Sequence, residues 1–157
     1  YSPERAGGLE TAGGIATALP LLGNEPFLVV NGYVLTDIDF QAARLAAQRM
    51  QEHNLLAHLW LVDNPPHHPE GDFGLLSDGL VSASSTTDGQ ALTFSGVGVY
   101  HPALFKDTPA HQAAKLAPLL RQAMNQSQIS GEHHNGNWLD VGTVERLQET
   151  DRIAQSW

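Results

Sequence analysis

Acidic side chains that follow apolar segments are the residues of this sequence best placed to do chemistry. Asp140, in the segment NWLDVGT, lies between an aromatic and apolar strand and a glycine turn. A carboxylate in that place can face a cleft and hold Mg²⁺ through oxygen. It can equally cap the helix expected after it, because Asp is a common N-cap. The same two alternatives hold for Asp37 and Asp39, while Asp63 can simply close the turn that follows it.

Histidine pairs offer a second kind of chemistry, a zinc or iron site. The pairs and the acidic residues near them are His67, His68, Glu70 and Asp72, and then Glu132, His133 and His134. Adjacent residues on a strand point to opposite faces, and neither pair has the i, i+4 spacing that places two imidazoles on one side of a helix. A histidine-metal hydrolase is therefore a weak alternative. A serine hydrolase is weaker still, because Ser95 lacks the G-x-S-x-G motif and its strand-turn-helix setting.

The segment from Pro26 to Phe40 is expected to position this chemistry. The uninterrupted apolar run of residues 27–30 predicts a strand buried on both faces, and Asn31 and Gly32 predict a tight turn after it. Apolar residues at helical spacing then predict a helix from about Asp39 to His53. Such a unit is typical of an open α/β sheet, in which ligands bind at the carboxyl ends of the strands. The site is therefore expected around residues 31–37.

The remaining segments predict further strands and helices around that unit. Residues 57–64 form a second buried strand, residues around 78–79 a hairpin turn, and residues 91–102 a returning strand in which Gly96 allows close approach of a ligand or backbone. Helices are expected at 15–22, at 115–124 and from about residue 142, with one strand between 129 and 141. Residues 1–14 carry four of the fifteen glycines, which predicts a loop close to a ligand or a flexible terminus.

Composition limits the class of protein. At 157 residues the chain is of single-domain size, and no apolar stretch approaches the length of a membrane span, so a soluble, cytoplasmic protein is expected. The absence of cysteine excludes disulfides, zinc thiolate sites and cysteine nucleophiles. A net charge of -9 argues against nucleic-acid binding, which needs clustered Lys and Arg. The sequence begins with Tyr1 rather than Met, which is compatible with a start inside a longer protein.

Three segments taken together resemble the sugar-1-phosphate nucleotidyltransferases, the enzymes that make nucleotide sugars. They are LETAGGI at 9–15, FLVVNGYVLTD at 27–37 and GNWLDVGT at 136–143, with FSGVGVYHP between the second and the third. Within the family the chain is most similar to the bacterial N-acetylmuramate 1-phosphate uridylyltransferases of cell-wall (peptidoglycan) recycling. The corresponding segments of that group are ETGGGI, VNGD and WVDVGT.

The resemblance implies a fold, a reaction and a set of site residues. The fold is α/β, a Rossmann-like nucleotidyltransferase domain of the glycosyltransferase-A type, with a mixed sheet flanked by helices. The reaction joins a nucleoside triphosphate and a sugar 1-phosphate into an NDP-sugar and pyrophosphate, with Mg²⁺ as cofactor. Asp140 is the implied catalytic residue and metal ligand. The implied substrate-binding residues are Gly8, Thr11, Ala12 and Gly13 at the base and ribose, Asn31 and Gly32 on the floor of the site, and Gly96 at the sugar.

Two departures from the family pattern lower the activity that the resemblance predicts. The family's first strand and its glycine-rich loop with Arg and Pro-Lys have no counterpart, and Lys106 and Lys115 do not replace them. Residues 1–157 are thus expected to form a single partial domain, the C-terminal two thirds, without the N-terminal βαβ portion. Tyr33 stands where the family's NGD motif has Asp, the other Mg²⁺ ligand, and a phenol is a poor ligand for a hard cation.

An impaired enzyme is therefore the first hypothesis, and a non-catalytic partner that binds a nucleotide sugar or regulates another protein is the alternative. A partial sheet also leaves an exposed edge strand, which favours association with another polypeptide. We accordingly expect an oligomer, or pairing with the missing N-terminal segment.

Overall fold

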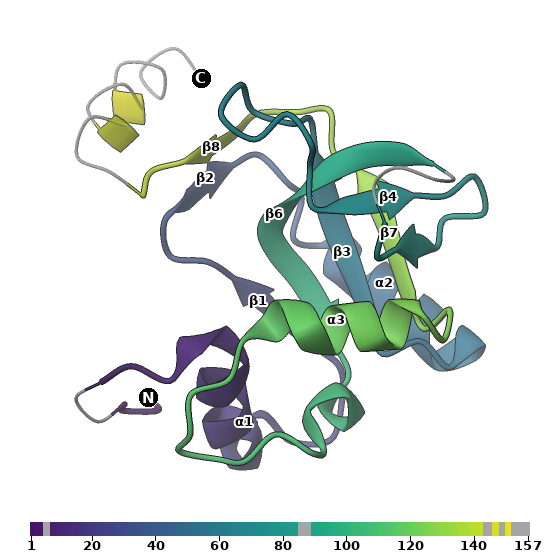
Figure 1. Cartoon of the computed structure of the whole chain (residues 1–157). Coiled ribbons are helices and arrows are strands. Elements are labelled where there is room, and N and C mark those ends of the chain that lie inside the picture. The colour runs from purple at the N-terminus through teal and green to yellow at the C-terminus, as the bar shows by residue number, and fades with distance from the viewer. Residues whose placement is uncertain (5–6, 85–88, 143–145, 148–149, 152–157) are drawn as a thin grey trace.

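The computed structural model describes residues 1–4, 7–84, 89–142, 146–147 and 150–151, and it has an α/β architecture. The helices and strands, in chain order, are α1 (Glu10–Leu22), β1 (Phe27–Val30), β2 (Val34–Thr36), α2 (Ala42–His53), β3 (Ala57–Val62), β4 (Phe73–Leu75), β5 (Val81–Ser82), β6 (Gln90–Tyr100), the 3₁₀-helix η1 (Pro102–Phe105), α3 (Leu116–Met124), β7 (Ile129–His133) and β8 (Trp138–Asp140). The main sheet has the strand order β5-β4-β6-β3-β7, with β1 also paired to β6, and β2 and β8 form a separate ribbon (Figure 1). The main sheet is mixed, because β3 runs parallel to β7 and antiparallel to β6. The α/β class and the mixed sheet expected from the sequence are confirmed.

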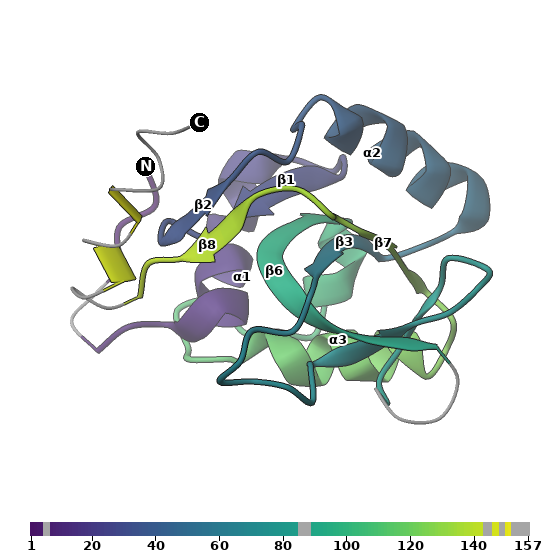
Figure 2. The same cartoon turned by 90° about the horizontal axis from the view of Figure 1, so that it is seen from above.

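The sheet lies between two layers of helices, and Figure 2 shows α2 on one face and α3 on the other. The strand β3 is buried along its whole length and alternates between two cores. Leu59 and Leu61 belong to the core under α1 and α3, whereas Trp60 belongs to the core under α2. This double burial explains the continuous apolar composition of the strand, and the predicted buried strand at 57–64 is confirmed.

Strand β6 has two different neighbours along one of its edges. Residues 97–100 pair with β1, and residues 90–92 pair with β4, both antiparallel. Within the described part of the chain, no strand pairs with the stretch between them on that side. Two local contacts replace the ladder there: the Asp72 carboxylate accepts a hydrogen bond from the Phe94 backbone N–H at 2.9 Å, and the Asn31 backbone N–H donates to the Gly96 carbonyl at 3.0 Å.

Two other predicted elements are confirmed. The hairpin at residues 78–79 joins β4 and β5, with Gly79 at a φ of +83° and the Asp78 carboxylate accepting from the Leu80 N–H at 2.9 Å. The helix expected at 115–124 is α3, and Pro118 lies in its first turn, where a missing N–H costs nothing.

The prediction for residues 27–40 is wrong in two respects. Strand β1 is half-buried rather than buried, since within the described structure it pairs only with β6 and Val30 is 38% exposed. It is followed by β2 and not directly by a helix, so it does not begin a βα unit. The apolar run arises because Phe27 and Val29 pack on one core and Leu28 on the other, although no described strand pairs with the outer edge of β1.

The N-terminal loop prediction is also wrong after residue 9, because α1 begins at Glu10 and includes Gly13 and Gly14. The Ala12 and Gly13 N–H groups donate to the Ala114 carbonyl at 2.9 and 3.2 Å. A side chain on Gly13 would collide with the Gln112 backbone. Glycine is therefore needed for the close packing of this helix and not for a loop.

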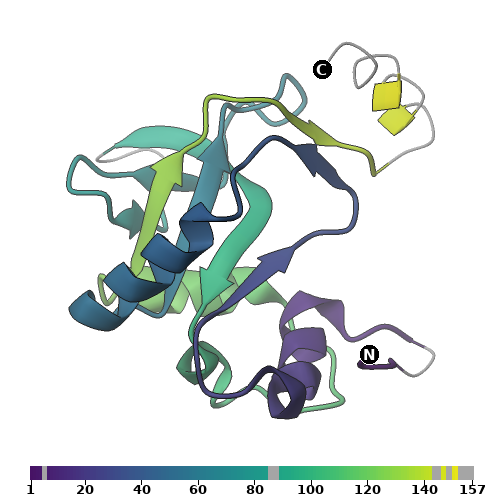
Figure 3. The same ribbon diagram turned by 180° about the vertical axis from the view of Figure 1, so that it is seen from behind.

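Two predictions near the C-terminus need a comment. The single strand expected within 129–141 is two strands, and β8 leaves the main sheet to pair with β2 (Figure 3). Residues 146–147 and 150–151 are helical, whereas residues 143–145, 148–149 and 152–157 of the expected last helix lie outside the described residues. No helix among the residues described is long and apolar enough to cross a membrane.

Candidate functional site

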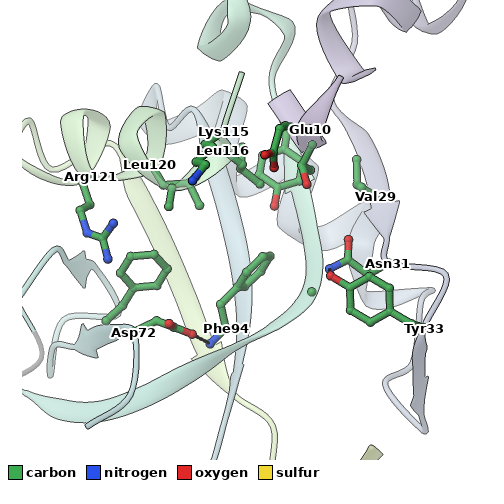
Figure 4. Close-up of a pocket in the computed structure, with 15 residues that line it drawn as sticks. Glu10, Val29, Asn31, Tyr33, Asp72, Phe94, Lys115, Leu116, Leu120 and Arg121 are labelled. Carbon is green, nitrogen blue, oxygen red and sulfur yellow. Dashed lines mark hydrogen bonds between the residues drawn. The ribbon is translucent and has the colours of Figure 1, made fainter. Parts of the chain in front are cut away.

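Two cavities adjoin at the gap in the β6 ladder. The first, called here the α3 cavity, has a volume of about 400 Å³ and lies among α3, β1 and β6 (Figure 4). The second, the β8 cavity, has a volume of about 360 Å³ and extends from the same place to β8. The residues that line both cavities are Asn31, Tyr33, Phe94 and Gly96. These four residues form the shared wall of a two-part site.

The shared wall depends on a glycine. Gly96 has a φ of +80°, a left-handed conformation that side chains rarely adopt, and a Cβ built there would lie 2.6 Å from Asn31 Nδ2. The Asn31 side chain in turn donates a hydrogen bond to the Tyr33 hydroxyl at 3.0 Å. The close approach expected at Gly96 is thus made by the Asn31 side chain.

The β8 cavity contains Asp140 and Tyr33 because β2 and β8 bring them together. Val34 lies opposite Asp140 in the ribbon, and the Val141 N–H donates to the Tyr33 carbonyl at 2.8 Å. The Asp140 carboxylate already has two contacts. It pairs with the Arg146 guanidinium at 2.9 Å and accepts from the Gly142 N–H at 2.9 Å.

The residues described do not fit a hard metal ion. Among them, no group of three or more His, Asp or Glu side chains is arranged so that it could hold a metal. Asp140 is neutralised by Arg146, and the neutral Tyr33 phenol is a poor ligand for Mg²⁺. A metal role for Asp140 therefore stays an expectation of the resemblance.

The histidines do not gather at one point, and three of them lie beside three different carboxylates. His68 Nε2 lies 3.1 Å from Asp72 Oδ1, His133 Nε2 lies 3.0 Å from Asp63 Oδ1, and His134 Nε2 lies 2.8 Å from Asp37 Oδ1. This arrangement does not favour a histidine-metal hydrolase.

Asp37 has a structural role that the sequence did not indicate. Its carboxylate accepts hydrogen bonds from the Asn137 backbone and side-chain N–H groups at 2.8 and 2.9 Å. The backbone hydrogen bond is the main reason why the pKa of Asp37 is lowered, with His134 adding to it. Asp37 thereby fixes the loop between β7 and β8. Asp140 is the last residue of β8. The alternative of a helix cap is not supported for Asp39 either: the N-cap of α2 is Gln41, and the Asp39 carboxylate accepts from the Gln41 N–H at 2.9 Å in a turn before the helix.

The structure brings together some of the predicted site residues and separates others. Thr11, Asn31 and Gly96 line the α3 cavity, and Asn31, Gly96 and Asp140 line the β8 cavity. Four predicted residues line neither cavity within the described structure: Gly8, Ala12, Gly13 and Gly32. Ala12 is fully buried in the core, and among the described residues no atom lies within 4 Å of a Cβ built on Gly8 or Gly32.

Sequence reasoning did not place four charged residues at the α3 cavity: Glu10, Asp72, Lys115 and Arg121. Lys115 is the N-cap of α3 and Arg121 lies within the helix, and both line the cavity together with Leu116 and Leu120. An offset of six residues corresponds to a rotation of about 600°, which leaves the two positions about 120° apart around a helix, so their spacing in the sequence gave no signal of a shared cavity. Asp72 follows a polar loop, and nothing in the sequence links it to Phe94.

Solved structures with the same fold define the class. A UDP-glucose pyrophosphorylase complexed with UDP-glucose matches 94% of this chain and 63% of its own length, with a TM-score of 0.68 and 16% identity. The inositol-1-phosphate CTP transferase from T. maritima matches 94% of this chain and 62% of its own length, with a TM-score of 0.66 and 16% identity. The fold is that of the sugar-1-phosphate nucleotidyltransferases.

Sequence relatives identify the family. The N-acetylmuramate alpha-1-phosphate uridylyltransferase of Neisseria meningitidis serogroup B is 60% identical over 157 residues, which are 100% of this chain and 67% of the relative. The protein of the same name from Caulobacter vibrioides is 30% identical over 162 residues, or 99% of this chain and 66% of the relative. No family model matches the chain. The chain belongs to the N-acetylmuramate alpha-1-phosphate uridylyltransferase family, and it spans about two thirds of the length of these curated relatives.

Proposed function

We propose that the protein is a nucleotidyltransferase that makes UDP-N-acetylmuramate and pyrophosphate from UTP and N-acetylmuramate 1-phosphate, for peptidoglycan recycling. The observation that carries this proposal is the 60% identity to the Neisseria relative over the whole chain. In the reaction, an oxygen of the sugar phosphate forms a bond to the α-phosphorus of UTP. The bond from that phosphorus to the bridging oxygen breaks, and pyrophosphate leaves.

The two cavities support a site with a sugar-binding part and a nucleotide-binding part. Asn31 and Gly96 form the wall against which the sugar binds, and Thr11 at the start of α1 contributes to the nucleotide side. Residues 1–157 then supply the sugar-facing part of a partial domain. Mg²⁺ would belong to the complete site, but the donor set described here does not fit it, so we assign no step to the metal.

Impaired catalysis by this chain is part of the proposal. The Tyr33 phenol and the Asp140–Arg146 ion pair leave no free carboxylate in the described wall of the β8 cavity. The same observation favours a second candidate, a non-catalytic protein that binds the nucleotide sugar. The two candidates differ in turnover and in their dependence on Mg²⁺.

Location and assembly are also proposals. UTP and sugar phosphates are cytoplasmic metabolites, which supports a cytoplasmic protein. The unpaired edge of β1 in the described structure supports its coverage by another polypeptide, either a second copy or the family's N-terminal portion. A mass equal to one chain by light scattering would exclude the second copy.

The proposed function is tested by a pyrophosphate-release assay and by calorimetry. We expect the chain to bind UDP-N-acetylmuramate and to release pyrophosphate slowly but measurably from UTP and N-acetylmuramate 1-phosphate, in a reaction that depends on Mg²⁺. Binding that is independent of Mg²⁺, with no release of pyrophosphate, would favour the non-catalytic candidate. Rapid turnover would contradict the impairment but support the reaction. The absence of binding of both the nucleotide sugar and the sugar phosphate would contradict the function itself.

A further inference from the structure

The α3 cavity has two cations on one wall. Lys115 precedes the first residue of α3, and Arg121 lies further along the same helix. Figure 4 shows Lys115 beside the start of α3 and Arg121 on the helix, both across the cavity from Asn31 and Tyr33. The chain has only 8 Lys and Arg against 17 acidic residues, so two cations at one cavity are unusual for its composition.

Neither cation is neutralised in the part of the chain that the structure describes. No ion pair joins Lys115 or Arg121 to a described acidic side chain, and Arg121 instead lies 5.5 Å from the centroid of the Phe73 ring. Of the two acidic residues at this cavity, Asp72 is engaged by the Phe94 N–H and by His68. Glu10 alone opposes the two cations. An anionic group of a ligand could therefore bind in this cavity, attracted by both cations, without displacing an existing ion pair.

The rest of the cavity surface favours a ligand with a small apolar group beside its charge. Leu116, Leu120, Val29 and Phe94 line the same cavity. The first turn of α3 also lies at this wall, and the positive end of the helix dipole adds to the attraction for an anion. Muramate differs from glucosamine by a lactyl ether, which carries a methyl group and a carboxylate. This substituent matches a wall of two cations and two leucines.

We propose that Lys115 and Arg121 form a subsite for the carboxylate of the sugar's lactyl group, and that this subsite distinguishes muramate from glucosamine. The inference rests on the proposed function, because it places the sugar in the α3 cavity. A carboxylate and a phosphate are both anions that Lys and Arg bind well, so the test must separate the two.

The test is isothermal titration of the whole chain and of Lys115→Met with three sugars. N-acetylmuramate 1-phosphate has both anions, N-acetylmuramate has only the carboxylate, and N-acetylglucosamine 1-phosphate has only the phosphate. We expect Lys115→Met to lower the affinity for both muramates by about tenfold, the size of one charge-assisted hydrogen bond. The affinity for N-acetylglucosamine 1-phosphate is expected to change by less than about twofold on the same scale.

Three further variants make the result specific. Lys115→Arg keeps the charge and is expected to restore most of the affinity, and Arg121→Met is expected to act in the same direction as Lys115→Met. Lys106→Met removes an exposed cation that lies outside both cavities, and it is the matched control. Thermal melting checks that each variant is folded.

The outcomes separate this inference from the proposed function. An equal loss for all three sugars, a loss confined to the phosphorylated ones, or no loss in Lys115→Met would overturn the carboxylate subsite and leave the proposed function standing. If the unchanged chain binds none of the three sugars, the proposed function fails and the subsite fails with it.

Discussion

The side-chain amide of Asn31 donates a hydrogen bond to the hydroxyl of Tyr33 at 3.0 Å, on the wall that the two cavities share. The Tyr33 side chain is a bulky phenol, whereas the family motif has a carboxylate at this position. The relationship therefore fixes the electrostatics of the site: the described wall contains an amide and a phenol where a divalent cation would need charged oxygen ligands.

Replacing Tyr33 by Asp is expected to raise the affinity for divalent cations by about tenfold or more, since a second carboxylate would then face Asp140 across the β8 cavity. Manganese binding measured by electron paramagnetic resonance is a direct readout. Tyr33→Phe is the control, because it removes the hydrogen bond from Asn31 but adds no charge. Equal metal affinities for Tyr33→Asp and Tyr33→Phe would show that position 33 does not limit metal binding.

The ion pair between Asp140 and Arg146 is expected to contribute modestly to stability. Their side chains are 30% and 36% exposed, so solvent screens the pair, and its coupling free energy should be about 0.5–1 kcal/mol. A double-mutant cycle with Asp140→Asn and Arg146→Met, followed by urea denaturation, measures this value. Additive effects of the two substitutions would mean that the pair contributes nothing.

Gly96→Ala is expected to destabilise the protein by about 1–3 kcal/mol, because the left-handed backbone is unfavourable for alanine and the new Cβ would press on Asn31. Gly32→Ala is the matched control, since no described atom lies within 4 Å of the added Cβ and the φ of Gly32 is not left-handed. Thermal melting of both variants checks the prediction. A melting temperature for Gly96→Ala that matches Gly32→Ala would contradict the close packing at this wall.

His58 is expected to make stability fall in mild acid. Burial lowers its pKa, opposed by Glu132 and aided by Arg49, and no hydrogen bond to its Nε2 exists within the described structure. The unfolded chain, with a His pKa of about 6.5, binds the proton more readily than the folded one. The contribution of neutral His58 is therefore complete above that value and decreases as the pH falls below it.

Melting temperatures measured from pH 8 to pH 5.5 test this linkage. His58→Gln should flatten the decrease at acid pH, whereas His53→Gln, at an exposed position, should leave it unchanged. An identical acid slope in His58→Gln and the unchanged chain would rule out His58 as its source.

Local sequence patterns predicted β3 correctly, because both of its faces are buried. They were less successful for β1, which pairs along only one edge in the described structure. The run 57–62 is apolar because both faces of β3 are buried, and its prediction was correct. The similar run 27–30 belongs to a half-exposed strand, because hydrophobicity records contacts with the faces of a sheet and not hydrogen bonds at its edge.

The residues of the candidate site that belong to sequence motifs could be predicted. Asn31, Gly96 and Asp140 were identified from the resemblance and line the cavities. Lys115 and Arg121 were not, because a cation on an amphipathic helix is ordinarily a solvated surface residue. Only the packing of α3 beside β6 places both at one cavity.

The central claim, that the two cavities around Asn31 and Gly96 form the nucleotide-sugar site, is tested most directly by backbone NMR. Amide shifts of the whole chain are followed during titration with UDP-N-acetylmuramate. We predict that the largest changes cluster at Asn31, Phe94 and Gly96, with smaller changes at Thr11 and Leu116. Saturable changes confined to residues remote from both cavities, or none at millimolar ligand, would contradict the claim.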